Sequence, residues 1–377
     1  MDEAKPGALA LLREEGALVF GALTTAVLMT VGAGWFELPG RPVSTVLLFL
    51  WIFAAMLWCA FGVVRHADSL ADLLGEPYGT LILTLSVISI EVSLMAAIML
   101  TGEANPTLAR DTMLAVIMIV LNALVGISLL IGGLRHGEQE FNLQGARAFL
   151  AVLIPLATMT LILPRFTKST DAATLSTTQE ILFGAITIAL YGIFLAVQTG
   201  RHRGFFMQPG PAGKRAADAG GHGHGPVRSV PFHAALLVLT MLPIVLLSKK
   251  LALLVDFGIA TLAAPVALGG VLVAILVLAP EGLAAVHAAR ANQVQRSVNI
   301  CLGSALATIG LTVPAVLLIS LVTGEIVVLG LEEVEIVLLL LTLVLSMLTF
   351  GAVRTNMLQG VVHLVIFLVY LVLVFNP

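Results

Sequence analysis

Residues 80–100 read TLILTLSVISIEVSLMAAIML, an apolar run that carries one charged residue, Glu91. A helix needs about 20 apolar residues to cross the hydrocarbon core of a bilayer, and this run has that length. A helix on the surface of a soluble protein would present charged residues to water along one face. The run therefore predicts a transmembrane helix with a single carboxylate at membrane depth.

The composition of the whole chain agrees with a membrane protein. Hydrophobic residues make up 59% of the 377 residues and charged residues 11%, against about 25% charged residues in ordinary globular proteins. The net charge of −3, with no basic stripe, excludes nucleic acid as a main partner. Cys59 and Cys301 each lie in an apolar stretch, which excludes a disulfide-stabilised secreted scaffold.

Eleven stretches are long and apolar enough to be predicted as transmembrane helices. They are residues 17–37, 43–64, 79–101, 112–134, 146–163, 181–198, 232–248, 257–286, 298–322, 334–353 and 357–375. Residues 249–280 begin with Lys249, Lys250 and Asp256 and contain Pro265 and Pro280, so we expect the eighth helix to start late or to be broken. The chain is therefore expected to be an all-α integral membrane protein with about 11 transmembrane helices.

The distribution of Lys and Arg predicts the orientation in the membrane. With the N-terminus in the cytoplasm, 13 of the 19 Lys and Arg residues fall in cytoplasmic segments, as the positive-inside rule requires. An odd number of spans then places the C-terminus outside. We expect a multi-pass protein of the cell (inner) membrane, whose partners are the lipid bilayer and inorganic cations.

A polar segment, residues 199–231, divides the chain near its middle and reads as a basic, Gly- and His-containing cytoplasmic linker. It separates residues 1–42, with the first helix, and a five-helix repeat over 43–198 from a second five-helix repeat over 232–377. Because five is odd, the two repeats would have opposite orientations. Inverted repeats of this kind are typical of secondary transporters, with the substrate site near the midplane.

The two halves also share an order of chemistry-bearing residues. Each has an intramembrane carboxylate, then an arginine, then a polar residue inside an apolar run. These are Glu91, Arg110 and Asn122 in the first half, and Glu281, Arg296 and Thr308 in the second. The spacing from the arginine to the polar residue is 12 in both halves, which favours an internal repeat.

Glu91 and Glu281 are the candidate cation- and proton-binding residues. Ionisable residues inside a membrane are costly and usually functional, and Pro280 frees a backbone carbonyl beside Glu281. Two carboxylates with further oxygen donors can bind a hard cation. When no cation is bound, the repulsion between the two carboxylates favours their protonation. The further candidate oxygen donors are Asn122, Ser304, Ser86 and Thr308.

Other polar residues are weaker candidates for a functional role. Glu76 is a possible entry carboxylate and His287 a possible proton relay, although a structural histidine is the commoner case. His222 and His224 are expected to belong to a solvated linker. We interpret the acidic residues between 325 and 335 as a solvated outer patch. No phosphate loop, GxSxG motif or zinc spacing is found, so we expect no enzymatic activity and no cofactor.

Four stretches resemble the calcium/cation antiporter superfamily, and most closely bacterial ChaA-like members of its calcium–proton exchanger (CAX) branch. They are LGEPYGTLILTLSVISIEV (74–92), RDTMLAVIMIVLNALVGISLLIGGL (110–134), APEGLAAVHAARANQVQRSVNICLGSALATIGLTVP (279–314) and RTNMLQGVVHLVIFLVYLVLVFNP (354–377). The resemblance implies one extra helix followed by two inverted five-helix repeats. It also implies that Glu91 and Glu281 are the glutamates of the family's two Gly-Asn-x-x-Glu motifs, which coordinate the cation.

The sequence departs from that family at the motifs themselves. Val87-Ile88 and Val277-Leu278 stand where the motif has Gly-Asn. Two amide ligands are therefore missing, and a site poorer in amide oxygens suits sodium or potassium better than the family pattern does.

We expect a secondary antiporter that exports Ca²⁺ from the cytoplasm in exchange for protons through a shared two-glutamate site. The alternative within transport is a Na⁺(K⁺)/H⁺ antiporter that uses the same carboxylates. A passive cation channel and a membrane scaffold or receptor are the rivals from other classes. Coupling of cation flux to a proton gradient separates the antiporter from both.

The first prediction concerns topology. Reporter fusions after residue 215 and at the C-terminus should report opposite sides of the membrane, because the linker is expected inside and the last span ends outside. If both fusions report the same side, the 11-span arrangement is wrong.

Overall fold

The computed structural model describes residues 14–36, 42–74, 78–99, 106–170, 173–209 and 228–376. These residues are almost entirely helical, which confirms the all-α prediction. They form two compact units. Unit 1 comprises Met1–Thr101 and His224–Leu262, and unit 2 comprises Gly102–Gly223 and Ala263–Pro377. Each unit therefore draws on both halves of the sequence.

The described part of unit 1 contains four helices and one short turn of 3-10 helix. These are α2 (Gly16–Thr30), η1 (Gly32–Phe36), α3 (Pro42–Leu74), α4 (Tyr78–Met99) and α11 (Val230–Leu262). Helix α11 packs against α2, α3 and α4. Buried hydrophobic side chains of α3, among them Ile52, Met56 and Val63, contribute to the core.

The expected late start of the eighth helix is confirmed, because α12 (Ala267–Arg290) begins ten residues after the predicted start of that span. The predicted end of the seventh span at residue 248 is wrong, because α11 is one continuous helix from Val230 to Leu262. Its charged residues are accommodated without a break. The Lys250 ammonium lies 4.3 Å from the centre of the Phe36 ring, a cation–π contact. Asp256 is exposed. Long or exposed charged side chains can stay on a helix surface, so a short charged stretch does not end a helix.

Unit 2 holds the remaining helices and a two-stranded ribbon. Its first part comprises α5 (Leu108–Met118), η2 (Ile119–Leu124), α6 (Val125–His136), β1 (Gln139–Glu140), α7 (Leu143–Ala157), η3 (Thr158–Ile162), α8 (Leu163–Phe166), α9 (Thr177–Thr199) and η4 (Arg203–Phe206). Its second part comprises α12 (Ala267–Arg290), α13 (Val294–Ala307), η5 (Thr308–Thr312), α14 (Val313–Thr323), α15 (Glu333–Thr349), β2 (Arg354–Thr355) and α16 (Met357–Phe375).

The elements η2, η3 and η5 are single π-helical turns. Each joins two α-helical pieces into one long helix: Leu108–His136, Leu143–Phe166 and Val294–Thr323. A π-turn inserts an extra residue into the helical ladder, and such turns are frequent at functional sites.

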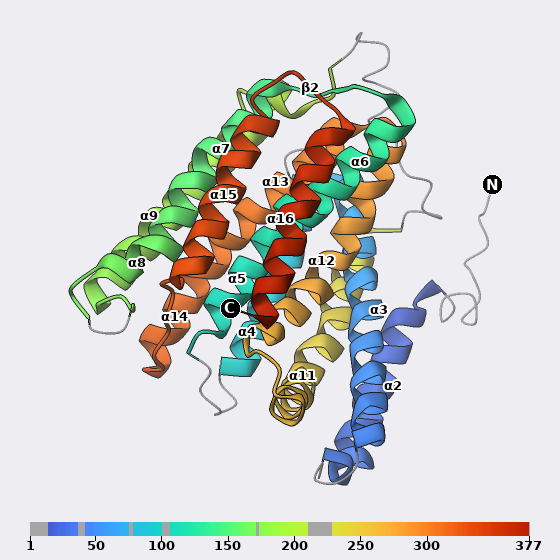
Figure 1. Cartoon of the computed structure of the whole chain (residues 1–377). Coiled ribbons are helices and arrows are strands. Elements are labelled where there is room, and N and C mark those ends of the chain that lie inside the picture. Colours follow the sequence, from blue (N-terminus) through green and yellow to red (C-terminus); the bar gives the residue numbers. More distant parts are fainter. Residues whose placement is uncertain are drawn as a thin grey trace, which may run out of the picture. The chain divides into compact units, whose positions relative to one another are not determined.

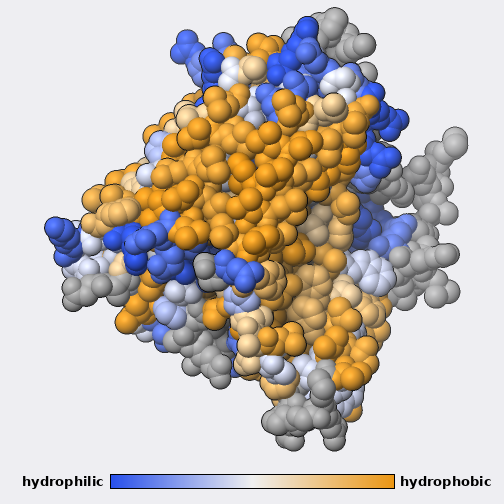
Figure 2. Space-filling view, viewed as in Figure 1, coloured by the Kyte–Doolittle hydropathy of each residue, from blue (hydrophilic) through white to orange (hydrophobic). Residues whose placement is uncertain are grey.

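Among the residues that the structure describes, eight helices are long and apolar enough to cross a membrane. They are Val43–Leu74, Leu108–His136, Leu143–Phe166, Thr177–Thr199, Val230–Leu262, Ala267–Arg290, Val294–Thr323 and Met357–Phe375. Gly16–Thr30 and Thr84–Ala97 are shorter apolar helices. Figure 2 shows a broad hydrophobic surface over α15 and α16, with hydrophilic side chains gathered at the end that carries β2. These features suit a lipid environment, and the count of eleven spans stays a prediction.

Hydrogen bonds gather four loops of unit 2 at one end of its helices. Strands β1 and β2 pair antiparallel, with Gln139 opposite Thr355 (Figure 1). The Gln139 amide also donates to Asn292 at 2.9 Å, between α12 and α13. The Asn142 side chain donates to the carbonyl of Gly204 at 3.1 Å, after α9.

The other loops of unit 2 meet at the opposite end. Arg110, at the start of α5, donates to the carbonyl of Gly330 at 3.3 Å. The backbone N–H of Val328 donates to the carbonyl of Pro106 at 2.9 Å. Arg165, at the end of α8, pairs with Glu332 at 3.4 Å. Loops that alternate between two ends are what successive membrane crossings require.

Helices α6 and α16 approach closely through glycines. A Cβ added at Gly360 would lie 2.6 Å from the backbone nitrogen of Leu130 and 2.7 Å from the carbonyl oxygen of Gly126. Small residues at helix contacts let backbones pack together in membranes, where no hydrophobic driving force holds helices together. This contact fixes the part of α16 that carries His363.

The second prediction tests that contact. Gly360→Ala should lower the thermal unfolding midpoint of the purified protein in detergent, because the methyl group forces backbones apart at a cost of about 1–3 kcal/mol. Gly192→Ala is the matched control, since nothing lies within 4 Å of a Cβ added at this position in α9. That change should leave the midpoint unchanged or raise it slightly. Equal midpoints for the two variants would contradict the close approach.

Candidate cation site

Glu281 lies inside α12, directly after Pro280. Its carboxylate accepts a hydrogen bond of 2.5 Å from the hydroxyl of Ser304 on α13. The glutamate is half-buried. A short, charge-assisted hydrogen bond stabilises a carboxylate held in an apolar helix. The structure thus brings together two residues that the sequence analysis proposed as ligands.

Small residues and a tyrosine define the surroundings of Glu281. A Cβ at Gly282 would lie 2.9 Å from the Leu124 side chain, so α12 packs tightly on the π-turn η2. A Cβ at Gly310 in η5 would lie 2.7 Å from the ring of Tyr191. Tyr191 and Cys301 both lie near the Glu281 carboxylate.

Asn122 and Thr308 both lie in π-turns. Asn122 lies in η2 and Thr308 begins η5, and both are at most 1% exposed. The spacing of 12 residues from the preceding arginine therefore leads to a π-turn in both halves. Carbonyl groups released from helical pairing at such turns can act as cation ligands.

The Asn122 amide is held by three neighbours in unit 2. Its nitrogen donates to the Thr342 hydroxyl at 2.8 Å and lies 3.6 Å from the Met118 sulfur. Its oxygen accepts from Nδ1 of His363 at 3.2 Å. The polar partners thus come from α15 and α16.

Glu91 and Ser86 belong to α4 in unit 1. Glu91 is 1% exposed and Ser86 is 6% exposed. The Ser86 hydroxyl donates to the carbonyl of Ile82, one turn earlier in the same helix, at 2.6 Å. This is the common way in which a hydroxyl is satisfied inside a membrane helix. The pairing of Glu91 with Glu281 stays a prediction.

Of the weaker candidate site residues, the structure describes His287. His287 is exposed on α12, six residues after Glu281. Glu76, His222 and His224 lie outside the described residues.

The interpretation of residues 325–335 as a solvated acidic patch is wrong for Glu335, whose side chain is 21% exposed, whereas the Glu332 side chain is 55% exposed. The Arg110 side chain, only 7% exposed, lies 3.4 Å from Glu332 and 3.9 Å from Glu335. Arg110 also pairs with Asp111 at 2.8 Å. A buried guanidinium needs such partners, and it ties the start of α5 to the start of α15.

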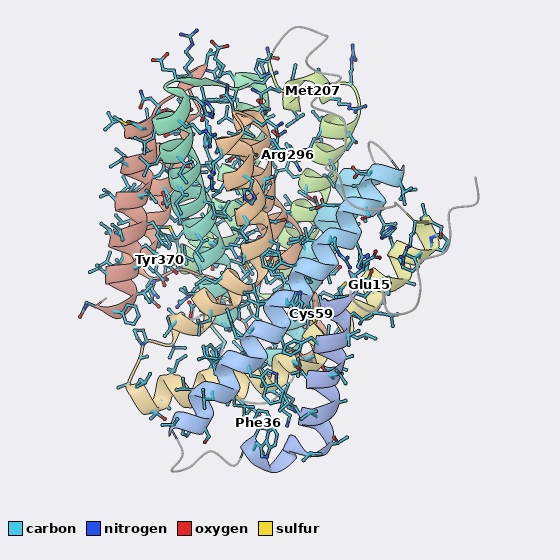
Figure 3. The ribbon with its side chains drawn as sticks, turned by 90° about the vertical axis from the view of Figure 1, so that its right-hand side faces the viewer. Glu15, Phe36, Cys59, Met207, Arg296 and Tyr370 are labelled. Carbon is cyan, nitrogen blue, oxygen red and sulfur yellow. The ribbon has the colours of Figure 1, made fainter. Side chains whose placement is uncertain are left out.

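Sequence analysis missed a cluster of ionisable residues in unit 1. The Glu15 carboxylate accepts from Nε2 of His66 at 3.0 Å and pairs with Arg65. The Nδ1 atoms of His66 and His233 lie 3.1 Å apart. The Arg228 backbone donates to Nε2 of His233 at 3.3 Å, so the proton of neutral His233 resides on Nδ1 and points to His66. Figure 3 shows Glu15 between α3 and the start of α11.

His363 was missed as well. It is 0% exposed in the middle of α16, with Nδ1 toward Asn122 and Nε2 2.9 Å from the Thr349 hydroxyl. The run VVHLVIFLVY (361–370) contains no other ionisable group except Tyr370. The rule that identified Glu91 also covers histidine inside a membrane helix and could have identified His363.

Comparison with known proteins gives a consistent family. The protein-family pattern described as sodium/calcium exchanger protein matches residues 44–200 and 232–376. Sodium-potassium/proton antiporter ChaA of Escherichia coli (strain K12) is 42% identical over 362 residues, which cover 96% of each chain. Putative ionic transporter y4hA of Sinorhizobium fredii is 41% identical over 333 residues, covering 88% of this chain and 89% of that one.

Solved structures share the fold at low sequence identity. Native YfkE superimposes with a TM-score of 0.73 at 18% identity and covers 96% of this chain and 100% of its own. An H⁺/Ca²⁺ exchanger CAX gives a TM-score of 0.68 at 14% identity, covering 96% of this chain and 88% of that one. The resemblance drawn from the sequence alone is thereby confirmed.

Proposed function

The chain belongs to the sodium/calcium exchanger protein family, and on this premise we propose that it is a secondary antiporter exchanging cations for protons. The observation that carries the proposal is the Glu281 carboxylate, placed inside the apolar helix α12 and hydrogen-bonded to Ser304 at 2.5 Å. A carboxylate in such a place binds either a cation or a proton. One site with those two alternatives is the minimum that exchange requires.

The transported ion is proposed to be Na⁺ or K⁺, with Ca²⁺ as the second candidate. Val87-Ile88 and Val277-Leu278 supply no side-chain oxygen, and a relative 42% identical bears the name sodium-potassium/proton antiporter. Calcium takes six to eight oxygen ligands, which these departures make harder to assemble. Two carboxylates at one site would nevertheless balance a divalent charge, and this favours keeping Ca²⁺ in the test.

In the proposed mechanism, Glu91 and Glu281 belong to two inverted five-helix repeats and form one shared site. The site opens to either side of the membrane in turn. Outside, the cation leaves and the carboxylates take up protons. The protonated form returns because neutral carboxyl groups are less costly at membrane depth than carboxylates. The inward proton gradient then drives cation export from the cytoplasm.

The third prediction tests the two carboxylates. Glu91→Gln and Glu281→Gln should each abolish cation-driven proton movement in sealed everted vesicles, because either change removes half of the site's negative charge and one titratable group. Both variants should still insert, since an amide is less costly to bury than a carboxylate. Glu325→Gln is the control, because Glu325 is exposed, and it should exchange like the unchanged protein.

Two results would contradict this account. Normal exchange by both glutamine variants would remove the carboxylates from the mechanism and favour a scaffold or receptor. Normal exchange by Glu281→Gln alone would mean that the second half contributes backbone carbonyls around Pro280 in place of a side chain.

The fourth prediction concerns pH. The apparent affinity for the cation should rise from about pH 6 to about pH 9, because a site that loses protons to bind a cation binds it better when protons are scarce. The measurement is the half-saturating cation concentration for proton movement at each pH. A constant value across this range would show that protons and cation do not share a site. Flux that needs no proton gradient and moves no protons would indicate a channel.

A further inference from the structure

Five polar side chains lie deep inside unit 2, and hydrogen bonds join four of them; the exception is Ser346, whose buried hydroxyl has no hydrogen-bond partner among the described residues. The five are Asn122 of η2, His363 of α16, and Thr342, Ser346 and Thr349 of α15, and none is more than 1% exposed. The α15 residues recur at intervals of four and three, so they line one face of that helix. Burying polar groups among apolar helices destabilises a membrane protein unless they are satisfied or functional.

The hydrogen bonds fix the state of the histidine. The Asn122 oxygen can only accept, so Nδ1 of His363, 3.2 Å away, carries the proton. Nε2 is then the acceptor in neutral imidazole, and the Thr349 hydroxyl donates to it at 2.9 Å. The imidazole thus has one orientation and one tautomer.

The same bonds fix the amide of Asn122. Its nitrogen donates to Thr342 and its oxygen accepts from His363, so both ends of the amide are hydrogen-bonded. An amide oxygen has two lone pairs, and His363 uses one of them. The second lone pair remains for another partner, in a direction that His363 determines.

We propose that His363 is a positioning residue that determines ion specificity by holding the Asn122 oxygen in place. This inference rests on the proposed function and on Asn122 supplying one of the site's oxygen ligands, as predicted from the sequence. The N–H group at Nδ1 holds the Asn122 oxygen, and the Thr349 hydroxyl keeps the proton on Nδ1 by donating a hydrogen bond to Nε2. Because a rigid ligand selects between cations by distance, loosening Asn122 should change the ranking of ions as well as their affinity.

The experiment compares three substitutions that separate the two ring nitrogens. Asparagine places an N–H close to the position of Nδ1, glutamine places one close to Nε2, and leucine has neither. Half-saturating concentrations of Na⁺, K⁺ and Ca²⁺ are measured for each variant by proton movement in sealed everted vesicles, together with the maximal rate. Expression and the thermal unfolding midpoint in detergent are recorded for each variant.

His363→Leu and His363→Gln should raise the half-saturating concentration of the preferred ion about fivefold to tenfold, the effect of losing one buried hydrogen bond. The maximal rate should change less than the affinity, and the ranking of the three ions should alter. His363→Asn should recover most of the affinity. Recovery by the asparagine variant and not by the glutamine variant identifies the Nδ1 donor, even if the leucine variant fails to fold.

A double-mutant cycle completes the test. In an Asn122→Ala background, His363→Gln should have little further effect on affinity, because a residue that acts through Asn122 loses its influence when that side chain is removed. Three results would overturn the inference: additive effects, unchanged affinity and ion ranking in all three His363 variants, or equal losses in the asparagine and glutamine variants. Absence of exchange in the unchanged protein would instead overturn the proposed function.

Discussion

The cost of placing a carboxylate among apolar helices is the constraint on which the rest of this structure depends. A charged side chain at the centre of a bilayer is unfavourable by a few kcal/mol or more, depending on how the surroundings relax. Around Glu281 that cost is reduced locally: the Ser304 hydroxyl donates a hydrogen bond at 2.5 Å. Gly282 admits the Leu124 side chain, and this brings the π-turn η2 against the helix that carries the glutamate. The Ser304 hydroxyl thus both reduces that cost and places an oxygen donor beside the carboxylate.

Features of the structure that depend on composition and residue spacing could be predicted from the sequence. Apolar length predicted the long apolar helices of the described residues, and isolated charge made Glu91 and Glu281 the candidate site residues. The interval of 12 residues after each arginine leads to a π-turn in both halves, at Asn122 and at Thr308. No sequence pattern predicted the π-turns themselves, because they depend on how neighbouring helices pack.

Other features could not be predicted from single segments of the sequence. The contact of Asn122 with His363 joins residues far apart in the chain, and neutral histidine adds nothing to a count of formal charge. The ion pair of Arg110 with Glu332 also joins distant segments, so residues 325–335 taken alone indicated only an acidic stretch. The charged residues near Lys250 were given too much weight, because a long helix can carry them on its surface or over an aromatic ring.

The central claim is that protons and a metal cation are exchanged through this chain. The most direct measurement uses the purified protein in sealed liposomes with an imposed pH gradient, to which Na⁺, K⁺, Ca²⁺ and Mg²⁺ are added one at a time while internal pH is followed. The account predicts that Na⁺ or K⁺, and in the second instance Ca²⁺, dissipates the gradient with cation moving in the opposite direction. A gradient that persists after every addition, or cation movement without proton movement, would contradict it.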